Sequence, residues 1–172
     1  MELTRRDAVA ALGALGVGGT LAGCVAPPGA EPIDTERIRE GLVAAAEVVY
    51  PSEVSGTATF VEAFLEGRLT DRSHAEGMET AVAELDDNAA AWYDDPFPAL
   101  SVAEREQVLR NVNADTADEN PEGTMSERVR YYVVNELLLA LYASPTGGEL
   151  VGIENPQGHP GGIGSYQRGP DA

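Results

Sequence analysis

Apolar side chains recur at helical spacing through the middle of the chain, and no stretch alternates as a half-buried strand does. Over residues 34–49 they repeat every three or four positions, Asp34 precedes them as an N-cap, and Pro51 follows as a stop. The same spacing predicts four further helices, over about residues 58–69, 71–93, 101–112 and 126–143. The pattern therefore predicts an all-α fold, a small bundle of about five helices formed by residues 34–143.

Two details sharpen this prediction. Ser101 and Glu104 have the spacing of a capping box, which fixes the start of the fourth helix. The third helix has one apolar stripe, the side that such a helix turns toward the core, with Met78, Val82, Leu85, Ala89 and Trp92.

The fifth predicted helix is apolar almost all round. Apart from the tyrosines, the only polar side chains between residues 131 and 143 are Asn135 and Glu136. Such a helix is central to the fold or also faces a partner. A buried carboxylate at Glu136 is costly unless it is paired or protonated. Three interpretations are open: a structural pair with an arginine, a contact to a partner subunit, or a catalytic carboxylate.

Residues 144–172 differ from the helical part, because they are rich in glycine and proline and carry few charges. Apolar anchors remain at Leu150, Val151, Ile153, Ile163 and Tyr166. We predict a long extended C-terminal tail that docks on a partner through its backbone and these anchors. A tail without fixed structure is the alternative.

The charge is strongly acidic. Of 172 residues, 29 are acidic and 11 basic, for a net charge of −18, and every basic residue is arginine rather than lysine. This balance excludes a nucleic-acid binder that works through a basic face. The like charges of so acidic a chain repel one another and oppose folding, and high salt screens this repulsion. The composition therefore indicates a halophilic, archaeal-type source.

The first thirty residues have the order of an export signal. The pair Arg5 and Arg6 precedes an uncharged run, residues 8–22, which is too short to span a membrane. Leu-Ala-Gly-Cys follows and ends at Cys24, before a Pro/Gly linker. We predict a twin-arginine signal peptide with a lipobox over 1–23, and a lipidated cysteine with its linker over 24–33.

Other candidate chemistry is sparse. Cys24 is the single cysteine, and the two histidines, His74 and His159, lie in distant segments without metal-ligand spacing. His74 stands beside Ser73 and Glu76 and is predicted to lie on the surface. The sequence predicts no catalytic, cofactor-binding or metal-binding residue in this chain.

Several of these features together resemble the gluconate 2-dehydrogenase subunit 3 family. The resemblance covers roughly residues 34–168. It includes Tyr50-Pro51 at the end of the first helix and Phe60-Val61-Glu62 in the second. Its distinctive part is the fifth helix running into residues 142–148, followed by Asn-Pro-Gln-Gly-His-Pro-Gly at 155–161 and Tyr166.

The resemblance implies a non-catalytic small subunit. Its partner would be a large flavoprotein of the glucose–methanol–choline type, which binds FAD, oxidises a sugar, sugar acid or alcohol, and passes electrons to a cytochrome or another membrane acceptor. The small subunit would carry the export signal for both subunits, through Arg5 and Arg6. The complex would then lie on the outer face of the cytoplasmic membrane, anchored by a lipid on Cys24.

The fifth helix and the tail are the predicted interface with the large subunit. The residues assigned to it are Tyr132, Glu136, Tyr142, Ser144, Pro145, Gly147, Gly148, Pro156, His159, Pro160 and Tyr166. Two other functions stay open: an independent lipid-anchored helical binding module without a flavoprotein partner, and an enzyme based on carboxylates or a histidine-bound metal.

Overall fold

The computed structural model describes residues 1–16 and 32–151, and this part of the chain is helical. Its elements are α1 (Arg5–Ala14), α2 (Thr35–Val49), α3 (Thr57–Arg68), α4 (Arg72–Tyr93), the 3-10 turn η1 (Phe97–Ala99), α5 (Val102–Asn111), α6 (Met125–Val129), the π segment η2 (Arg130–Asn135), α7 (Glu136–Ala143) and α8 (Pro145–Leu150). Among these residues the only β-type pairing is one isolated parallel bridge between Glu2 and Ser55. The all-α prediction is confirmed, with more helices than the five expected.

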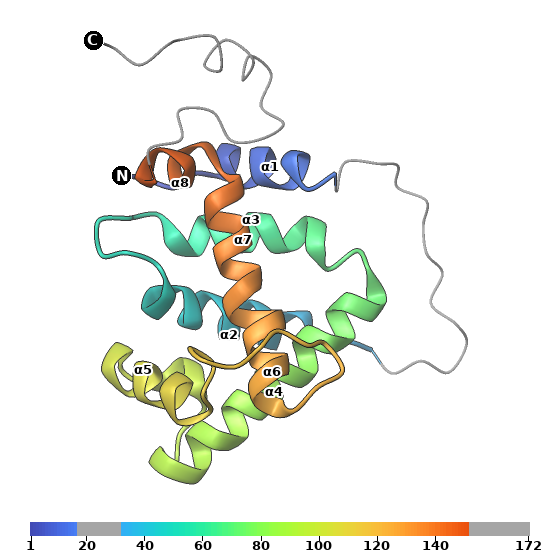
Figure 1. Cartoon of the computed structure of the whole chain (residues 1–172), viewed down its shortest axis with the longest axis vertical. Coiled ribbons are helices and arrows are strands. Elements are labelled where there is room, and N and C mark those ends of the chain that lie inside the picture. The colour runs from blue at the N-terminus through green and yellow to red at the C-terminus, as the bar shows by residue number, and fades with distance from the viewer. Residues whose placement is uncertain (17–31, 152–172) are drawn as a thin grey trace, which may run out of the picture.

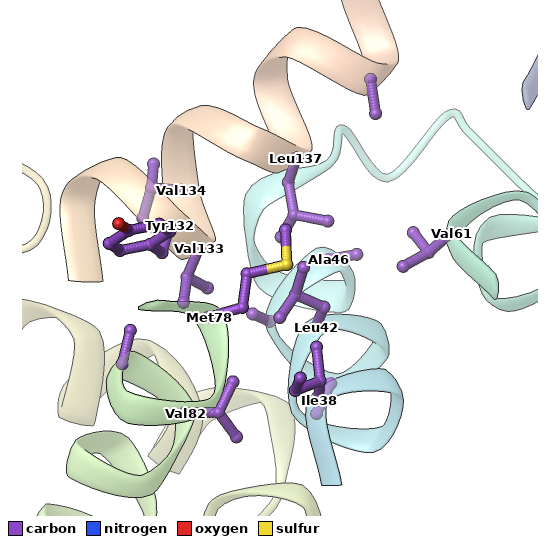
Figure 2. Close-up of a cluster of buried hydrophobic side chains, with 14 of the residues drawn as sticks. Ile38, Leu42, Ala46, Val61, Met78, Val82, Tyr132, Val133, Val134 and Leu137 are labelled. Carbon is purple, nitrogen blue, oxygen red and sulfur yellow. The ribbon is translucent and has the colours of Figure 1, made fainter. Parts of the chain in front are cut away.

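The helices are arranged around α7. In Figure 1, α7 runs across α3 and α2, from α6 at one end to α8 and α1 at the other, and it contacts all of these except α6 directly. The interior is one continuous hydrophobic core. Figure 2 shows part of this core, in which Met78 of α4 lies between Leu42 of α2 and Leu137 of α7.

Local sequence signals set most helix starts. The Asp34 carboxylate accepts a hydrogen bond from the Arg37 backbone N–H at 3.0 Å. Ser101 and Glu104 form the predicted capping box. The stripe of α4 is buried from Met78 to Ala89, but Trp92 is 67% exposed and that part of the prediction is wrong. Tyr93, rather than Trp92, continues the core-facing side of α4, since it packs against the core while residues 90–92 are all exposed.

The predicted fifth helix is present as a continuous helical run with a change of register. It begins in α6, passes through the π segment η2 and continues as α7. A π segment inserts a wider turn into the i→i−4 ladder and re-aims the side chains that follow it. Here the residue that follows directly is Glu136.

The start of the tail is not extended as predicted. Ser144 caps the short helix α8, because its hydroxyl accepts a hydrogen bond from the Gly147 N–H at 3.0 Å and Pro145 occupies the first helical turn. Gly147 packs so closely on α7 that an added Cβ would lie 1.9 Å from the Leu141 carbonyl oxygen. The rest of the tail, residues 152–172, lies outside the described residues.

The N-terminal residues form part of the folded body. Helix α1 packs against α3, α7 and α8, and Leu3, Ala8 and Ala11 are buried. Cys24 and the linker residues up to 31 lie outside the described residues.

Candidate functional site

A buried charged cluster lies where three helices meet. Arg68 ends α3, His74 stands in the first turn of α4, and Glu136 begins α7. The Arg68 Nε donates to Glu136 Oε1, and its Nη2 donates to Glu136 Oε2 at 3.0 Å. The Glu136 side chain is only 4% exposed. The pairing of Glu136 with an arginine, one of the three interpretations left open by the sequence, is confirmed.

His74 completes this cluster. Its Nε2 lies 3.2 Å from Glu136 Oε2 and 3.0 Å from Arg68 Nη2. These two contacts need opposite proton positions, because Nε2 must carry a proton to donate to Glu136 and must lack one to accept from Arg68. The prediction that His74 lies on the surface is wrong, since its side chain is 12% exposed. Its polar sequence neighbours point outward while the helix turns His74 inward.

The electrostatics of the pair follow from this geometry. Burial would raise the pKa of Glu136, but hydrogen bonds from His74 and Arg68 and the positive charge of Arg68 outweigh it, so the pKa lies below its usual value. The hydrogen bond to Glu136 in turn raises the pKa of Arg68. Both groups are therefore ionised near neutral pH, and the lowered pKa makes the Glu136 carboxylate a weaker base than an ordinary one.

Aromatic rings close the cluster. The His74 ring centroid lies 5.3 Å from that of Tyr132, which meets Tyr131 edge-on at 4.8 Å. The absence of a side chain at Gly77 makes room for Tyr132, because a Cβ there would lie 2.1 Å from its Cζ. The Tyr50 hydroxyl donates to the Leu137 carbonyl at 2.9 Å, and burial together with the Glu136 charge raises the pKa of Tyr50.

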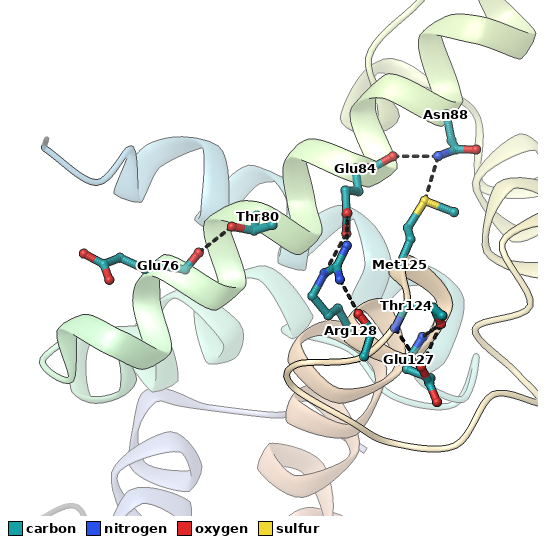
Figure 3. Close-up of polar contacts among 9 residues, drawn as sticks. Glu76, Thr80, Glu84, Asn88, Thr124, Met125, Glu127 and Arg128 are labelled. Carbon is teal, nitrogen blue, oxygen red and sulfur yellow. Dashed lines mark hydrogen bonds and ion pairs between the residues drawn. The ribbon is translucent and has the colours of Figure 1, made fainter.

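A second polar network fixes the start of the α6–η2–α7 run. The Arg128 guanidinium pairs with Glu84 of α4 and also donates to the Gly123 carbonyl (Figure 3). Asn88 bridges the Glu84 carbonyl at 2.9 Å and the Met125 sulfur at 3.2 Å. This network joins α4 to α6 and so positions the helix that carries Glu136.

The surface also has a shallow groove of about 500 Å³ between α2, α4, η1 and α5. Two arginines line it, and both are engaged. Arg37 Nε pairs with Asp86 at 2.7 Å, and Arg105 pairs with Glu47 and donates to the Pro98 carbonyl at 2.9 Å. The groove therefore presents carboxylates as well as cations and favours no particular charge of ligand.

The described part of the predicted interface divides into buried and exposed positions. Tyr132, Glu136, Ser144, Gly147 and Gly148 are buried within the chain itself. Tyr142 is 48% exposed, and Pro145 is partly exposed. Their role at a partner interface stays a prediction. Pro156, His159, Pro160 and Tyr166 lie outside the described residues.

An exposed residue that sequence reasoning missed lies near Tyr142. Leu139, one turn earlier on α7, is 42% exposed, and Leu139 and Tyr142 are the two large apolar residues exposed on that helix. Their i, i+3 spacing places both on one face of α7. The spacing alone could not identify them, because the whole helix is apolar.

Two features are absent from residues 1–16 and 32–151, a metal-ligand cluster and a membrane-spanning helix. Within these ranges no group of three or more His, Cys, Asp or Glu side chains is placed to hold a metal ion. In the same ranges no helix has the length and hydrophobicity needed to cross a bilayer.

Comparison with known proteins gives one match. The family model described as Gluconate 2-dehydrogenase subunit 3 matches residues 38–161, which is more than two thirds of the chain. The matched range begins in α2 and includes every residue of the Arg68–His74–Glu136 cluster. Neither the curated proteins nor the solved structures contain a match.

Proposed function

Since this chain belongs to the gluconate 2-dehydrogenase subunit 3 family, we propose that it is the non-catalytic small subunit of an exported, FAD-dependent dehydrogenase. The large subunit, a flavoprotein of the glucose–methanol–choline type, binds the FAD and oxidises a sugar, sugar acid or alcohol. Electrons leave it for a cytochrome or another membrane acceptor. The observation that carries this proposal is the family match over residues 38–161.

The internal pairing of the charged cluster supports a structural role for it. Arg68 donates to both carboxylate oxygens of Glu136, His74 contacts both partners, and the Tyr132 ring lies against His74. A carboxylate held ionised by a guanidinium is unsuited to shuttle protons near neutral pH. The cluster instead fixes the angle between α3, α4 and α7, and this orients the outer face of α7.

The outer face of α7 supports the contact with the large subunit. Leu139 and Tyr142 expose apolar surface on a helix that the chain otherwise buries. Exposed tyrosines are favoured at protein interfaces, because they bury a large apolar ring and can still use the hydroxyl. The tail that follows α8 extends this surface in the proposed complex.

Export and anchoring form the third part of the proposal. Arg5 and Arg6 are exposed on the first turn of α1, where a receptor can reach them. Flavin is inserted before export, so the large subunit crosses the membrane folded, and the twin-arginine route accepts folded cargo. After processing, the lipid on Cys24 holds the complex to the outer face of the membrane.

Affinity purification from native membranes in high salt tests the proposal. We expect the tagged chain to bring down a large flavoprotein with the absorbance of FAD, and the separated small subunit to contain no flavin. Recovery of the chain alone, or flavin bound to the isolated small subunit, would contradict it. Recovery alone would favour the independent lipid-anchored binding module.

Two variants test export and anchoring separately. Replacing Arg5 and Arg6 by Lys should leave both subunits in the cytoplasm. Cys24→Ser should release the complex from the membrane into the medium. Export of the large subunit in the first variant would show that it travels independently.

A further inference from the structure

The N-terminal segment, residues 1–15, is held by the folded body through its backbone. The Leu3 N–H donates to the Ser55 carbonyl at 2.8 Å, and the Ser55 N–H donates to the Met1 carbonyl at 2.9 Å. The N-terminal ammonium donates to the Glu53 carbonyl at 2.6 Å. These bonds align the first residues with the loop before α3, so α1 starts at a fixed place.

One side of this segment is buried, and the other faces solvent. Leu3, Ala8 and Ala11 are almost completely buried, whereas Val9 is 65% exposed. Figure 1 shows α1 beside α8 at the end of α7, and α1 contacts α3, α7 and α8. Because Ala8 and Ala11 are small, the α1 backbone approaches these helices closely.

Two glycines of the folded body leave the space that the N-terminal segment occupies, because a side chain at either position would clash with it. A Cβ on Gly56, which has a positive φ of 75°, would lie 2.2 Å from the Leu3 carbonyl oxygen. A Cβ on Gly67 of α3 would lie 2.7 Å from both methyl carbons of Leu12. By contrast, a Cβ on Gly13, on the solvent side of α1, would have no atom within 4 Å.

A polar contact ties the segment to α8. The Thr146 hydroxyl donates to Asp7 Oδ1 at 3.0 Å, while Asp7 Oδ2 caps α1 through the Thr4 N–H at 2.9 Å. Burial would raise the pKa of Asp7, but the hydrogen bonds from Thr4 and Thr146 lower it. The segment therefore contacts α3, α7 and α8, which all lie within the family-matched range, although the segment itself lies outside that range.

We propose that α3, α7, α8 and the 53–56 loop form a docking seat for the chain's own N-terminal segment. The seat competes with the export machinery for that segment. This inference rests on the proposed role of residues 1–23 as an export signal. The seat exists only once these helices have assembled, so folding determines how the signal is presented. Arg5 and Arg6 stay exposed, but the apolar side of the segment is covered.

The competition has a thermodynamic consequence. A ligand that binds only the undocked segment has its apparent affinity reduced by the undocked fraction. Loosening the seat therefore makes the segment more available to the signal peptidase and speeds cleavage before Cys24. Displacement of the segment also frees the Thr146 hydroxyl and uncovers Gly56 and Gly67.

Hydrogen exchange of the full chain in high salt tests the seat with substitutions placed in the N-terminal segment. Ala8→Asp places a charge in the seat, and Val9→Asp places the same charge one residue away in solvent. We expect the α1 amides to exchange at least about tenfold faster in Ala8→Asp than in Val9→Asp, with α2 and α4 protected in both. Equal exchange of α1 in the two variants would overturn the seat.

A second pair of variants leaves the signal sequence intact. Gly67→Leu fills the seat, and Glu66→Leu adds the same side chain at an exposed neighbouring position of α3. We expect only Gly67→Leu to release α1 in hydrogen exchange and to accelerate processing at Cys24 in cells. If Gly67→Leu releases α1 without accelerating processing relative to Glu66→Leu, the competition is wrong.

The twin-arginine variant separates this inference from the proposed function. Replacing the exposed Arg5 and Arg6 by Lys should stop export and leave the exchange of α1 unchanged. Continued export would refute the proposed signal, whereas the exchange results of the Ala8 and Gly67 variants would still decide whether the seat exists.

Discussion

Arg68 and Glu136 form a two-point ion pair across 68 positions of sequence, with each carboxylate oxygen accepting from a different guanidinium nitrogen. The pair joins the end of α3 to the start of α7, at the point where the π segment ends. His74 adds a third contact from α4. Three helices are thus held together by one buried carboxylate.

Removing one member of this pair should be strongly destabilising. Arg68→Met leaves the Glu136 carboxylate buried without its main partner, and we expect a loss of about 3–5 kcal/mol in the free energy of unfolding. The double variant Arg68→Met/Glu136→Leu should recover most of this loss, because it leaves no buried charge. Urea denaturation at constant high salt measures the free energy of unfolding of both variants. A double variant whose loss equals the sum of the losses of Arg68→Met and Glu136→Leu would contradict the prediction.

A surface pair provides the control. Arg110 and Glu106 form an i, i+4 ion pair with both side chains at least half exposed. Arg110→Met should change the free energy of unfolding by less than about 0.5 kcal/mol. If Arg110→Met lost as much free energy of unfolding as Arg68→Met, the assay would report the removal of any arginine charge and not the burial of the Arg68–Glu136 pair.

The same carboxylate predicts a pH dependence. The pKa of Glu136 is lower in the folded chain than the ordinary value of 4.5, so the unfolded chain takes up the proton first as pH falls. Its stabilising contribution is complete above the unfolded pKa and is lost as pH falls through the folded pKa. We expect urea midpoints to fall more steeply below about pH 4.5 in wild type than in Glu136→Gln. Parallel curves would contradict this.

The attachment of α8 to α7 depends on a glycine. A Cβ at Gly147 meets the Leu141 carbonyl, which is backbone and cannot rotate away, so Gly147→Ala should cost about 1–3 kcal/mol. Gly13→Ala, whose Cβ meets open space, should not destabilise the chain. Circular dichroism melts compare the two, and hydrogen exchange should show α8 released in Gly147→Ala. An unchanged melt would show that α8 tolerates the displacement.

The exposed face of α7 should matter for the complex and not for the fold. Tyr142→Ser should weaken binding of the large subunit by about tenfold or more if Tyr142 is an interface anchor. Trp92→Ser, at an exposed aromatic on the last turn of α4, should leave binding unchanged. Surface plasmon resonance with the purified large subunit measures both. Equal effects, or a drop in the melting temperature for Tyr142→Ser, would contradict the assignment.

The sequence was sufficient for those features that depend on neighbouring residues. The caps of α2 and α5 come from Asp34 and from the Ser101–Glu104 pair, and the structure confirms both. The burial of Glu136 within an apolar helix could also be predicted, and its pairing with an arginine was one of the three interpretations that the sequence left open. Which arginine pairs with it could not be predicted, since this depends on how α3 packs against α7.

Each feature that the sequence predicted wrongly or missed has a physical cause. His74 has polar neighbours, but the start of α4 places it toward Arg68, at the end of α3, and toward Glu136, which is distant in sequence. Helix α8 was missed because glycine and proline outweighed the Ser144 cap and a proline in the first turn, a combination that does favour a helix start. The π segment depends on packing against α4 and has no sequence signature.

The central claim is that this chain functions as the small subunit of a dehydrogenase complex. Purification of the native complex from membranes in high salt, followed by its absorbance spectrum and subunit masses, tests it most directly. We expect to recover this chain together with a large subunit that carries all the flavin. A chain isolated without a dehydrogenase subunit, or one that oxidises a substrate unaided, would contradict it.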